Sequence, residues 1–462
     1  MEARLVRDTI PDSVVELARR LGDRGHRAWV VGGSLRDLLL AEARGGAPVS
    51  PGSDWDIATD ARPEDVMRVF PRVIPTGIKH GTVTVLMGSG SYEVTTLRGE
   101  ATYSDGRRPD AVHFVDDIDA DLARRDFTIN AMAYDLASDR LIDPFGGMAD
   151  IAARVLRAVG DPAERFAEDG LRVLRAARFV ATLDVALDPA TERAIGPSLA
   201  SYRKVSAERI RDEWTKAMKA ERPSRAFDVM KDHGLLAITA PELLESVGCE
   251  QNRHHAYDVW GHAMHCLDGC PMDAGLRIAG LLHDIGKPRS REWSDKTNDF
   301  TFYEHERIGA EMAHSLLDRL RFSNDERARI TALVRHHLVC YDSSWTDAAV
   351  RRWLRRVGPQ LAPELYALNR ADVLAKGRDA TADLERLREL EEHVAKVVRD
   401  GAALTVRALA IDGHDLAKMG LRPGPIFGEI FRILLDEVVE DPSLNDRDRL
   451  LARAREIAER RD

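Results

Sequence analysis

The sequence predicts an α+β fold, in which a small mixed-sheet head is followed by an all-helical neck, body and tail. Strand signals fall almost entirely within the first 150 residues of the 462, and helical patterns punctuated by Pro and Gly dominate after them. Hydrophobic residues make up 44% and charged residues 31%, as in a soluble globular protein. We expect four domains: a head (1–150), a neck (151–250), a body (251–375) and a tail (376–462).

The head alternates short strands and helices. A buried strand is expected over residues 27–31, ending at Gly32-Gly33, and a helix over 34–40 with Ser34 as its N-cap. The remaining elements are a strand over 54–58, a helix over 63–70 that begins with Pro63, a hairpin of strands 82–87 and 92–97, and a polar loop over 99–111. The candidate catalytic residues lie just after the first strand and at the start of the second.

Asp54 and Asp56 flank Trp55 on a predicted strand. Successive strand residues point to opposite faces, so the two carboxylates point the same way and repel unless a cation lies between them. Mg²⁺ is the usual cation, because it takes oxygen ligands and leaves room for substrate phosphates. Glu93, on a nearby strand, is either a third ligand or an exposed carboxylate.

A glycine-rich turn precedes the acidic pair. Backbone N–H groups at Gly32-Gly33 can approach a triphosphate, and Arg36 lies one helical turn further on. A guanidinium offers forked donors to phosphate oxygens, although a salt bridge to Asp37 or Asp54 is the alternative role for Arg36. Together with the acidic pair, the turn favours metal-dependent transfer of a nucleotidyl group.

These motifs occur in the order seen in one family. The chain resembles the class II tRNA nucleotidyltransferases (CCA-adding enzymes) and bacterial poly(A) polymerases over most of residues 25–220. The resemblance implies addition of CMP and AMP to the 3′ end of tRNA from CTP and ATP, with Mg²⁺ at Asp54 and Asp56. The motifs are Gly32-Gly33-x-x-Arg36-Asp37, Asp54-x-Asp56, Arg124-Arg125-Asp126-Phe127-Thr128-x-Asn130-Ala131, Asp143-Pro144-Phe145-Gly146-Gly147 and Glu168-Asp169-x-x-Arg172.

Base choice is expected from a helix over residues 168–178, which places Asp169, Arg172 and Arg175 on one face. Cytosine and adenine both present an amino donor beside a ring-nitrogen acceptor, which suits an Asp acceptor next to an Arg donor. Uracil and guanine would leave these groups unpaired, at about 1–3 kcal/mol each. The resemblance implies that Asp169 and Arg172 read the base. It also implies nucleotide contacts for Gly33, Arg36, Arg125, Arg175 and Arg178, a bracing helix at 204–210, and terminal A addition from the full-length loop at 98–109.

Histidines concentrate between residues 254 and 372. The segment Leu281-Leu282-His283-Asp284-Ile285-Gly286-Lys287 resembles HD-type phosphohydrolases, whose pattern of a distant His, a His-Asp doublet and a distant Asp implies metal ligands at His262, His283, Asp284 and Asp372. Imidazoles and carboxylates suit a divalent transition metal such as Ni²⁺ or Mn²⁺. His305, His336 and His337 are candidates for a second metal or for a substrate phosphate.

The composition indicates where in the cell this chain acts and what it binds. Net charge is −10, which argues mildly against promiscuous RNA binding, and no run approaches the roughly 18 apolar residues of a membrane span. Four cysteines argue against a disulfide framework and favour buried thiols at Cys266 and Cys270 in the cytoplasm. No membrane association and no obligate protein partner are expected.

Three other functions remain open from the sequence. An A-adding enzyme or a poly(A) polymerase would carry the same motifs and form another product. The main activity could instead be a metal-dependent phosphohydrolase, or the chain could be a non-catalytic RNA-binding protein, against which the intact acidic pair argues.

Overall fold

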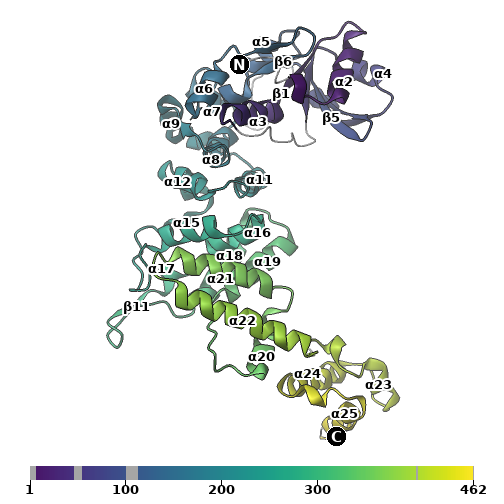
Figure 1. The fold of residues 1–462 in the computed structure, drawn as a ribbon, viewed down its shortest axis with the longest axis vertical. Helices are drawn as coiled ribbons and strands as arrows, with labels where there is room; N and C mark the ends of the chain where they lie inside the picture. Colours follow the sequence, from purple (N-terminus) through teal and green to yellow (C-terminus); the bar gives the residue numbers. More distant parts are fainter. Residues whose placement is uncertain (1–6, 46–54, 100–112, 402–403, 461–462) are drawn as a thin grey trace. The chain divides into compact units, whose positions relative to one another are not determined.

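The computed structural model describes residues 7–45, 55–99, 113–401 and 404–460. The chain divides into two compact units, residues 1–239 and 240–462, which are described separately. The strands of the large sheet lie in the first unit, and helices make up most of the second (Figure 1). The predicted fold class is confirmed, with two short strand pairs added to the helical part. The finer division into four domains stays a prediction.

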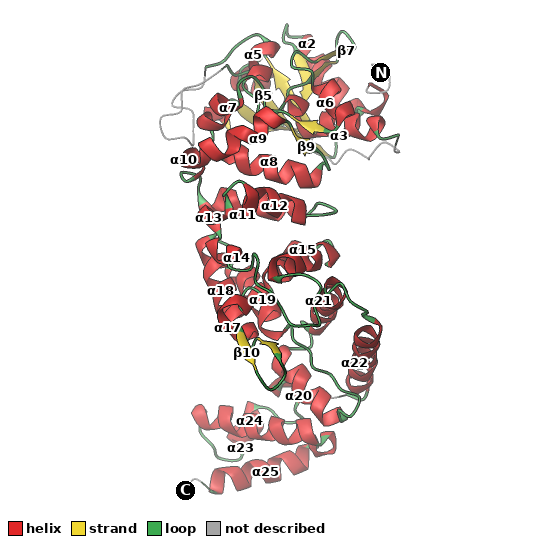
Figure 2. Cartoon of the chain, turned by 90° about the vertical axis from the view of Figure 1, so that its left-hand side faces the viewer, coloured by secondary structure: helices red, strands yellow, loops and turns green. Residues whose placement is uncertain are grey.

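A seven-stranded mixed sheet forms the centre of the first unit (Figure 2). Its order is β3-β4-β5-β2-β1-β6-β7; β2 and β5 run parallel, and the other neighbours are antiparallel. The strands are β1 (Ala28–Val31), β2 (Asp56–Thr59), β3 (Val73–Gly77), β4 (Thr82–Met87), β5 (Gly90–Thr96), β6 (Ala133–Asp135) and β7 (Arg140–Ile142). The predicted strands 27–31, 82–87 and 92–97 are thereby confirmed within a residue or two. The part of the predicted 99–111 loop from residue 100 on lies outside the described residues.

Helices cover this sheet. They are α2 (Asp12–Gly22), α3 (Gly32–Ala43), α4 (Pro63–Val69), α5 (Ile118–Ala123) and α6 (Gly147–Ala153). All four residues of β1 are buried, and α3 packs against β1, β2 and β6. The helix after β1 begins at Gly32 with Val31 in the N-cap position, so the prediction of Ser34 as N-cap is wrong. Gly32 turns directly from strand into helix because its φ of +82° is open to glycine at little cost.

The rest of the first unit is mainly helical, with α7 (Pro162–Glu168), α8 (Leu171–Thr182), α9 (Pro189–Ile195), α10 (Leu199–Tyr202), α11 (Ala207–Ala217) and α12 (Ser224–Asp232). The parallel pair β8 (Val155–Leu156) and β9 (Ala186–Leu187) lies among them. The single helix predicted over 168–178 is wrong at its start, because the chain is extended at Asp169 and α8 begins only at Leu171. A Cβ at Gly170 would meet the backbone of Ser201 and Tyr202, so this break is packed tightly against α10.

In the second unit, α15 packs against α16 and α21, and α19 packs against α16 and α18. A hairpin of β10 (Glu292–Ser294) and β11 (Asp299–Thr301) projects from these helices (Figure 1). The longer helices are α15 (Val259–Gly269), α16 (Ala274–Leu282), α18 (His305–Arg319), α19 (Asn324–His336), α20 (Asp347–Val357), α21 (Ala362–Ala375) and α22 (Thr381–Arg399). The last segment contains α23 (Gly413–Lys418), α24 (Pro425–Glu440) and α25 (Arg447–Glu459), which share one hydrophobic cluster.

Two simpler expectations can be checked directly. Cys266 and Cys270 are buried free thiols, as predicted. Among the described helices, none combines the length and the apolar character that crossing a bilayer requires.

Candidate functional site

A cavity of about 500 Å³ lies in the first unit where β1, β2 and β5 meet α3 and α8. All seven sequence-predicted nucleotide residues line it, together with Asp56 and Glu93: Gly33, Arg36, Arg125, Asp169, Arg172, Arg175 and Arg178. Eight arginines and five carboxylates line the cavity in all. This excess of positive charge suits a ligand with several phosphates.

Asp56 and Glu93 are direct neighbours on the parallel strands β2 and β5. Residues in register on adjacent strands project from the same face, so the two carboxylates share one edge of the cavity. Glu93 is therefore placed to be the third carboxylate that the sequence left undecided. Asp54 lies outside the described residues.

The absence of a side chain at Gly32 leaves room for the Asp56 carboxylate. A Cβ at position 32 would collide with the Asp56 carboxylate, whereas a Cβ at Gly33 would meet only the Arg36 guanidinium, at 3.5 Å. The first glycine thus makes room for the acidic residue. The turn is required by the carboxylate as well as by any phosphate that binds there.

We therefore expect Gly32→Ala to reduce nucleotidyl transfer by about 10²-fold, because misplacing a reacting group by roughly 1 Å costs that much. It should also lower the melting temperature, since alanine is strained at positive φ. Gly33→Ala is the matched control and should stay within about 3-fold of wild type. Steady-state incorporation and thermal unfolding measure both variants, and equal activity of the pair would show that Asp56 does not depend on the turn.

Arg36 is held in place by three contacts. Its guanidinium donates to Asp37 at 2.8 Å and to Asn130 Oδ1 at 2.8 Å, and lies 5.1 Å from the centre of the Phe179 ring. The surface salt bridge to Asp37 considered from the sequence therefore exists, while Arg36 still lines the cavity.

Arg175 and Arg178 pair with buried carboxylates. Arg175 donates to Asp126 at 2.7 Å, and Arg178 donates to Glu213 at 2.5 Å. Burial alone would raise the pKa of Asp126, but Arg175 and Asn130 lower it to about 2. Burial is the main cause that lowers the pKa of Arg178, and Glu213 opposes it. These pairs fix both guanidiniums against the cavity wall.

Asp169 and Arg172 do not form the ion pair that a continuous helix would allow. Asp169 accepts from Arg209 of α11 at 2.6 Å and from the Leu171 backbone N–H at 3.0 Å. Arg172 donates instead to Glu168 at 2.5 Å and to the Arg124 carbonyl at 2.9 Å. Both side chains still line the cavity, so the predicted acceptor and donor are both present there, each oriented by another partner.

Arg125 donates to Asp121 Oδ2 at 3.1 Å and to the Asn130 carbonyl at 3.2 Å. Its Nε is buried without an acceptor among the described residues. A buried donor without a partner is costly, so it marks a place where a ligand acceptor would be stabilised.

The sequence did not identify the residues that hold these groups: Asp121, Asp126, Asn130, Phe179, Arg209 and Glu213. Asp126 and Asn130 stand in a motif quoted above, and Arg209 stands in the predicted bracing helix. Their types and positions were visible in the sequence, but their partners, 40 to 49 residues away for Arg209 and Asp126, were not.

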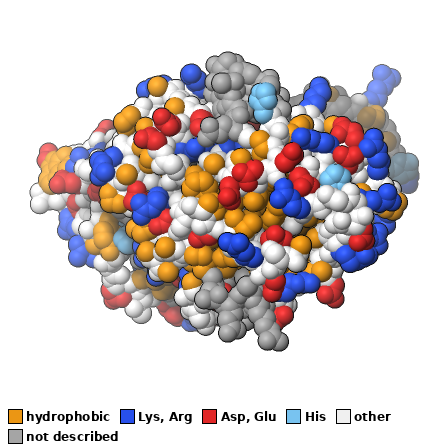
Figure 3. Space-filling model, turned by 90° about the horizontal axis from the view of Figure 1, so that it is seen from above, with side chains coloured by type: hydrophobic (Ala, Val, Ile, Leu, Met, Phe, Trp, Pro, Cys, Tyr) orange, Lys and Arg blue, Asp and Glu red, His pale blue; other side chains and the backbone are white. Residues whose placement is uncertain are grey.

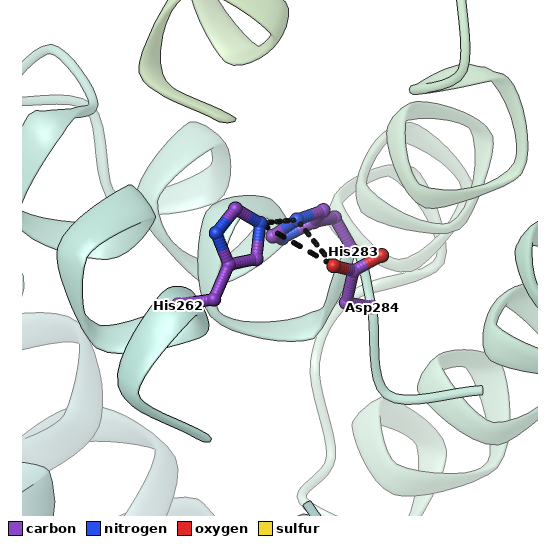
Figure 4. Close-up of side chains that lie close together, drawn as sticks. All are labelled: His262, His283 and Asp284. Atoms are coloured by element: carbon purple, nitrogen blue, oxygen red, sulfur yellow. Dashed lines mark hydrogen bonds and ion pairs between the residues drawn. The ribbon is translucent and has the colours of Figure 1, made fainter. Parts of the chain in front are cut away.

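The second unit contains a buried cluster of histidines and carboxylates. His262 Nε2 lies 3.1 Å from His283 Nε2, and both point at Asp284 Oδ2, at 3.3 and 3.2 Å (Figure 4). Asp372 Oδ1 lies 3.0 Å from His262 Nε2. The sequence-predicted ligand set therefore comes together from α15, the turn after α16 and α21: His262, His283, Asp284 and Asp372.

The other oxygen of Asp284 faces a second pair of histidines. Asp284 Oδ1 lies 3.4 Å from His305 Nε2 and 3.6 Å from His337 Nε2. Two groups of candidate ligands thus share one carboxylate. His336 belongs to neither group, so of the adjacent pair 336–337 only His337 is placed for metal binding.

The two carboxylates of the cluster favour the protonated form of His283. Burial alone would lower the pKa of His283, but Asp284 and Asp372 raise it to about 10. The same contacts hold the pKa of both carboxyls well below the usual range despite burial. Because neutral imidazoles and carboxylates are divalent-metal ligands, this donor set fits a metal that would replace the protons.

Comparison with known proteins gives three family matches in chain order. Residues 28–157 match the poly(A) polymerase head domain, residues 184–246 the probable RNA- and SrmB-binding site of polymerase A, and residues 254–377 the HD domain. The first match contains Asp56 and Glu93, and the third contains the complete histidine cluster.

Curated relatives match about half of the chain. A CCA-adding enzyme of Lactobacillus helveticus is 46% identical over 228 residues, 49% of this chain and 55% of that protein. One of a Geobacillus species is 46% identical over 219 residues, 47% of this chain and 52% of that protein. The chain therefore spans about half the length of the curated relatives it matches.

Solved structures extend the likeness to the whole fold. The crystal structure of the Bacillus stearothermophilus CCA-adding enzyme in complex with CTP aligns with a TM-score of 0.71 and 28% identity, covering 97% of this chain and 98% of that one. The Thermotoga maritima CCA-adding enzyme complexed with tRNA aligns with a TM-score of 0.53 at 19% identity, covering 99% and 98%, a likeness of fold alone.

Proposed function

We propose that this chain is a member of the family of poly(A) polymerases and CCA-adding enzymes and that it adds CMP and AMP to the 3′ end of tRNA, using CTP and ATP. The observation that carries the proposal is the cavity of the first unit, which joins the Asp56–Glu93 edge to the acceptor Asp169 and the donor Arg172. The Asp56–Glu93 edge offers carboxylates for a metal that would bind the triphosphate. Asp169 and Arg172 offer an acceptor and donors for a base.

Asp54, Asp56 and Glu93 are the residues proposed to hold Mg²⁺. When bound, the metal supplies activation of the attacking 3′-hydroxyl and charge stabilisation of the departing pyrophosphate. Arg36 and Arg125 are proposed to bind the phosphates, since both line the cavity and the buried Arg125 Nε has no acceptor of its own in the described chain. The fixed guanidiniums need no rearrangement when the charge develops.

Base selection is proposed to need no template. Asp169 offers an acceptor and Arg172 offers donors, which match the amino group and ring nitrogen shared by cytosine and adenine. Arg209 pairs with Asp169 and Glu168 pairs with Arg172, so the positions of the two side chains are set before the nucleotide arrives. Such preorganised polar sites discriminate strongly, because a mismatched base leaves buried groups unpaired.

RNA binding is proposed to depend on local charge and shape. On the face of the molecule in Figure 3, Lys and Arg side chains are interspersed with Asp and Glu, in keeping with the net charge of −10. The arginines of the cavity instead form a local positive site within an acidic chain. We propose that the reaction takes place in the cytoplasm, which the free cysteines support. We also propose that the protein acts without an obligate protein partner.

The test supplies tRNA ending before the CCA sequence, after the first C and after the second C, each with labelled CTP or ATP. We expect CMP on the first two ends and AMP on the third, with UTP and GTP incorporated at least about 10²-fold less well. Incorporation of ATP alone would identify an A-adding enzyme, and long runs of A would identify a poly(A) polymerase. Binding of tRNA without any incorporation would leave an RNA-binding protein.

A second activity is proposed for the second unit, as a metal-dependent phosphohydrolase. The supporting observation is the pair of ligand groups that share Asp284, since two adjacent divalent metals suit attack of water on a phosphate ester. Ni²⁺ or Mn²⁺ suits the imidazole-rich donor set.

A further inference from the structure

A single aromatic ring lies among the arginines of the first-unit cavity. Phe179 belongs to α8 and lines the cavity, although it is only 2% exposed. The guanidinium carbons of three arginines lie over its ring, Arg178 at 3.8 Å, Arg36 at 5.1 Å and Arg175 at 5.3 Å from the ring centre. Significant cation–π pairs occur roughly once per 70–80 residues, so three on one ring mark a place that gathers positive charge.

The three arginines come from two helices. Arg36 lies in α3, whereas Arg175 and Arg178 lie in α8, where Arg175 is one turn before Phe179. The ring itself is held by Phe127, which meets it in a T-shaped arrangement with 5.6 Å between ring centres and 85° between ring planes. The ring therefore gives the guanidiniums of both helices one fixed point of contact.

These guanidiniums are close enough to repel one another. Burial is the main cause that lowers the pKa of Arg178, and the positive charges of Arg175 and Arg36 lower it as well. Asp126 and Glu213 offset part of this repulsion, but each of these carboxylates also accepts an N–H group that would otherwise be available to a phosphate. An aromatic face attracts a cation through its quadrupole without using the in-plane N–H donors. The ring thus stabilises the gathered charges and leaves their donors for a ligand.

We propose that Phe179 is a positioning residue for nucleotidyl transfer, whose ring holds Arg36, Arg175 and Arg178 in place for the triphosphate of the incoming nucleotide. A polyanion binds more tightly where the cations are already gathered, because their repulsion need not be overcome when it arrives. The proposal rests on the nucleotidyl transfer proposed for the first unit. It adds a neutral side chain to a site that is otherwise described by its charges.

The test changes the quadrupole of the ring and keeps its size. Full-length protein is made with 4-fluoro-, 3,5-difluoro- or 3,4,5-trifluorophenylalanine in place of Phe179, since each added fluorine weakens the attraction of the ring for a cation. Calorimetry with inorganic tripolyphosphate in EDTA measures the binding of a polyanion that has neither a base nor a metal. We expect the dissociation constant to rise with the number of fluorines, by about 5-fold or more for the trifluorinated ring.

Phe227 provides the matched control. It is fully buried in α12, packs against Trp214 at 5.0 Å between ring centres, and is not among the described residues that line the cavity. The same fluorinated residues in place of Phe227 should leave the dissociation constant within about 1.5-fold of wild type. Thermal unfolding should give the same Tm within each series, because the packed volume is kept.

Phe179→Leu is a second variant, which keeps an apolar side chain and removes the quadrupole altogether. It should bind tripolyphosphate at least as weakly as the trifluorinated protein. A dissociation constant that stays equal to that of wild type across the fluorinated series would overturn the proposal, whatever the leucine variant does, because packing alone would then explain the ring.

The positioning role and the transfer reaction fail in different ways. In steady-state incorporation, KM for CTP should rise in the same order as the dissociation constant of tripolyphosphate. Affinity that falls with fluorination in a protein that incorporates no nucleotide would remove the transfer function and keep the role of Phe179. Normal incorporation with unchanged affinity across the series would keep the transfer function and overturn the role of Phe179.

Discussion

Asp56→Asn should reduce incorporation of both CMP and AMP by about 10³-fold or more, because one charged metal ligand becomes neutral and several kcal/mol of charge stabilisation are lost. The shape of the side chain is kept, so the turn at Gly32 should still fit around it. Single-turnover incorporation into tRNA lacking its last three nucleotides measures the effect. A filter-binding titration should give an unchanged dissociation constant for the tRNA.

Two further variants sharpen this prediction. Asp23→Asn is the control, because it removes a carboxylate that is exposed and pairs with Arg19 on the surface; it should leave incorporation unchanged. Glu93→Gln separates the two roles left open for that residue. A loss above about 10-fold would make Glu93 a ligand, and a change below about 2-fold would leave it an exposed strand carboxylate. Full activity of Asp56→Asn would refute the metal assignment.

Asp284→Asn should have the largest effect in the second unit, because Asp284 is the one carboxylate common to both ligand groups. We expect loss of bound Mn²⁺ or Ni²⁺, measured by elemental analysis after dialysis. Hydrolysis of a 2′,3′-cyclic nucleotide should fall by about 10³-fold or more. Incorporation of CMP and AMP should be unchanged, since the first-unit cavity has its own carboxylates.

His336→Ala is the matched control for this change. His336 is adjacent in sequence to His337 but belongs to neither ligand group, so its substitution should leave metal content and hydrolysis within about 2-fold of wild type. Circular dichroism should show that Asp284→Asn keeps its helices, since Lys287 retains Gln251 as a partner at 2.7 Å. Unchanged metal content in Asp284→Asn would show that the cluster is not a metal site.

Short-range patterns made most of the elements predictable. The burial of β1, the hairpin of β4 and β5 and the proline at the start of α4 follow from local residue preferences. The packed stripe of α22 follows from its apolar residues at helical spacing. Two local predictions were wrong. Gly32 allowed α3 to begin before Ser34, and the close approach of Ser201 to Gly170 interrupted the helix expected over 168–178.

The candidate ligands could be named from the sequence because each type of chemistry requires particular side chains in a particular order. Their partners could not, since charge pairing carries no local signal. Nothing near Asp169 indicates that Arg209, 40 residues later, holds it, or that Asp126 holds Arg175. Nor does the pair His336-His337 show which imidazole faces Asp284.

The sequence by itself therefore determined the fold class, the acidic and arginine motifs of the head and the residue types of the histidine cluster, because these depend on residue identity and spacing. Only the tertiary structure decided that Glu93 lies beside Asp56, that Asp169 and Arg172 are held by separate partners, and that one carboxylate serves two groups of histidines. The physical reason is that the distance between charged groups far apart in the chain is set by strand register, helix packing and burial. Local residue preferences do not set it.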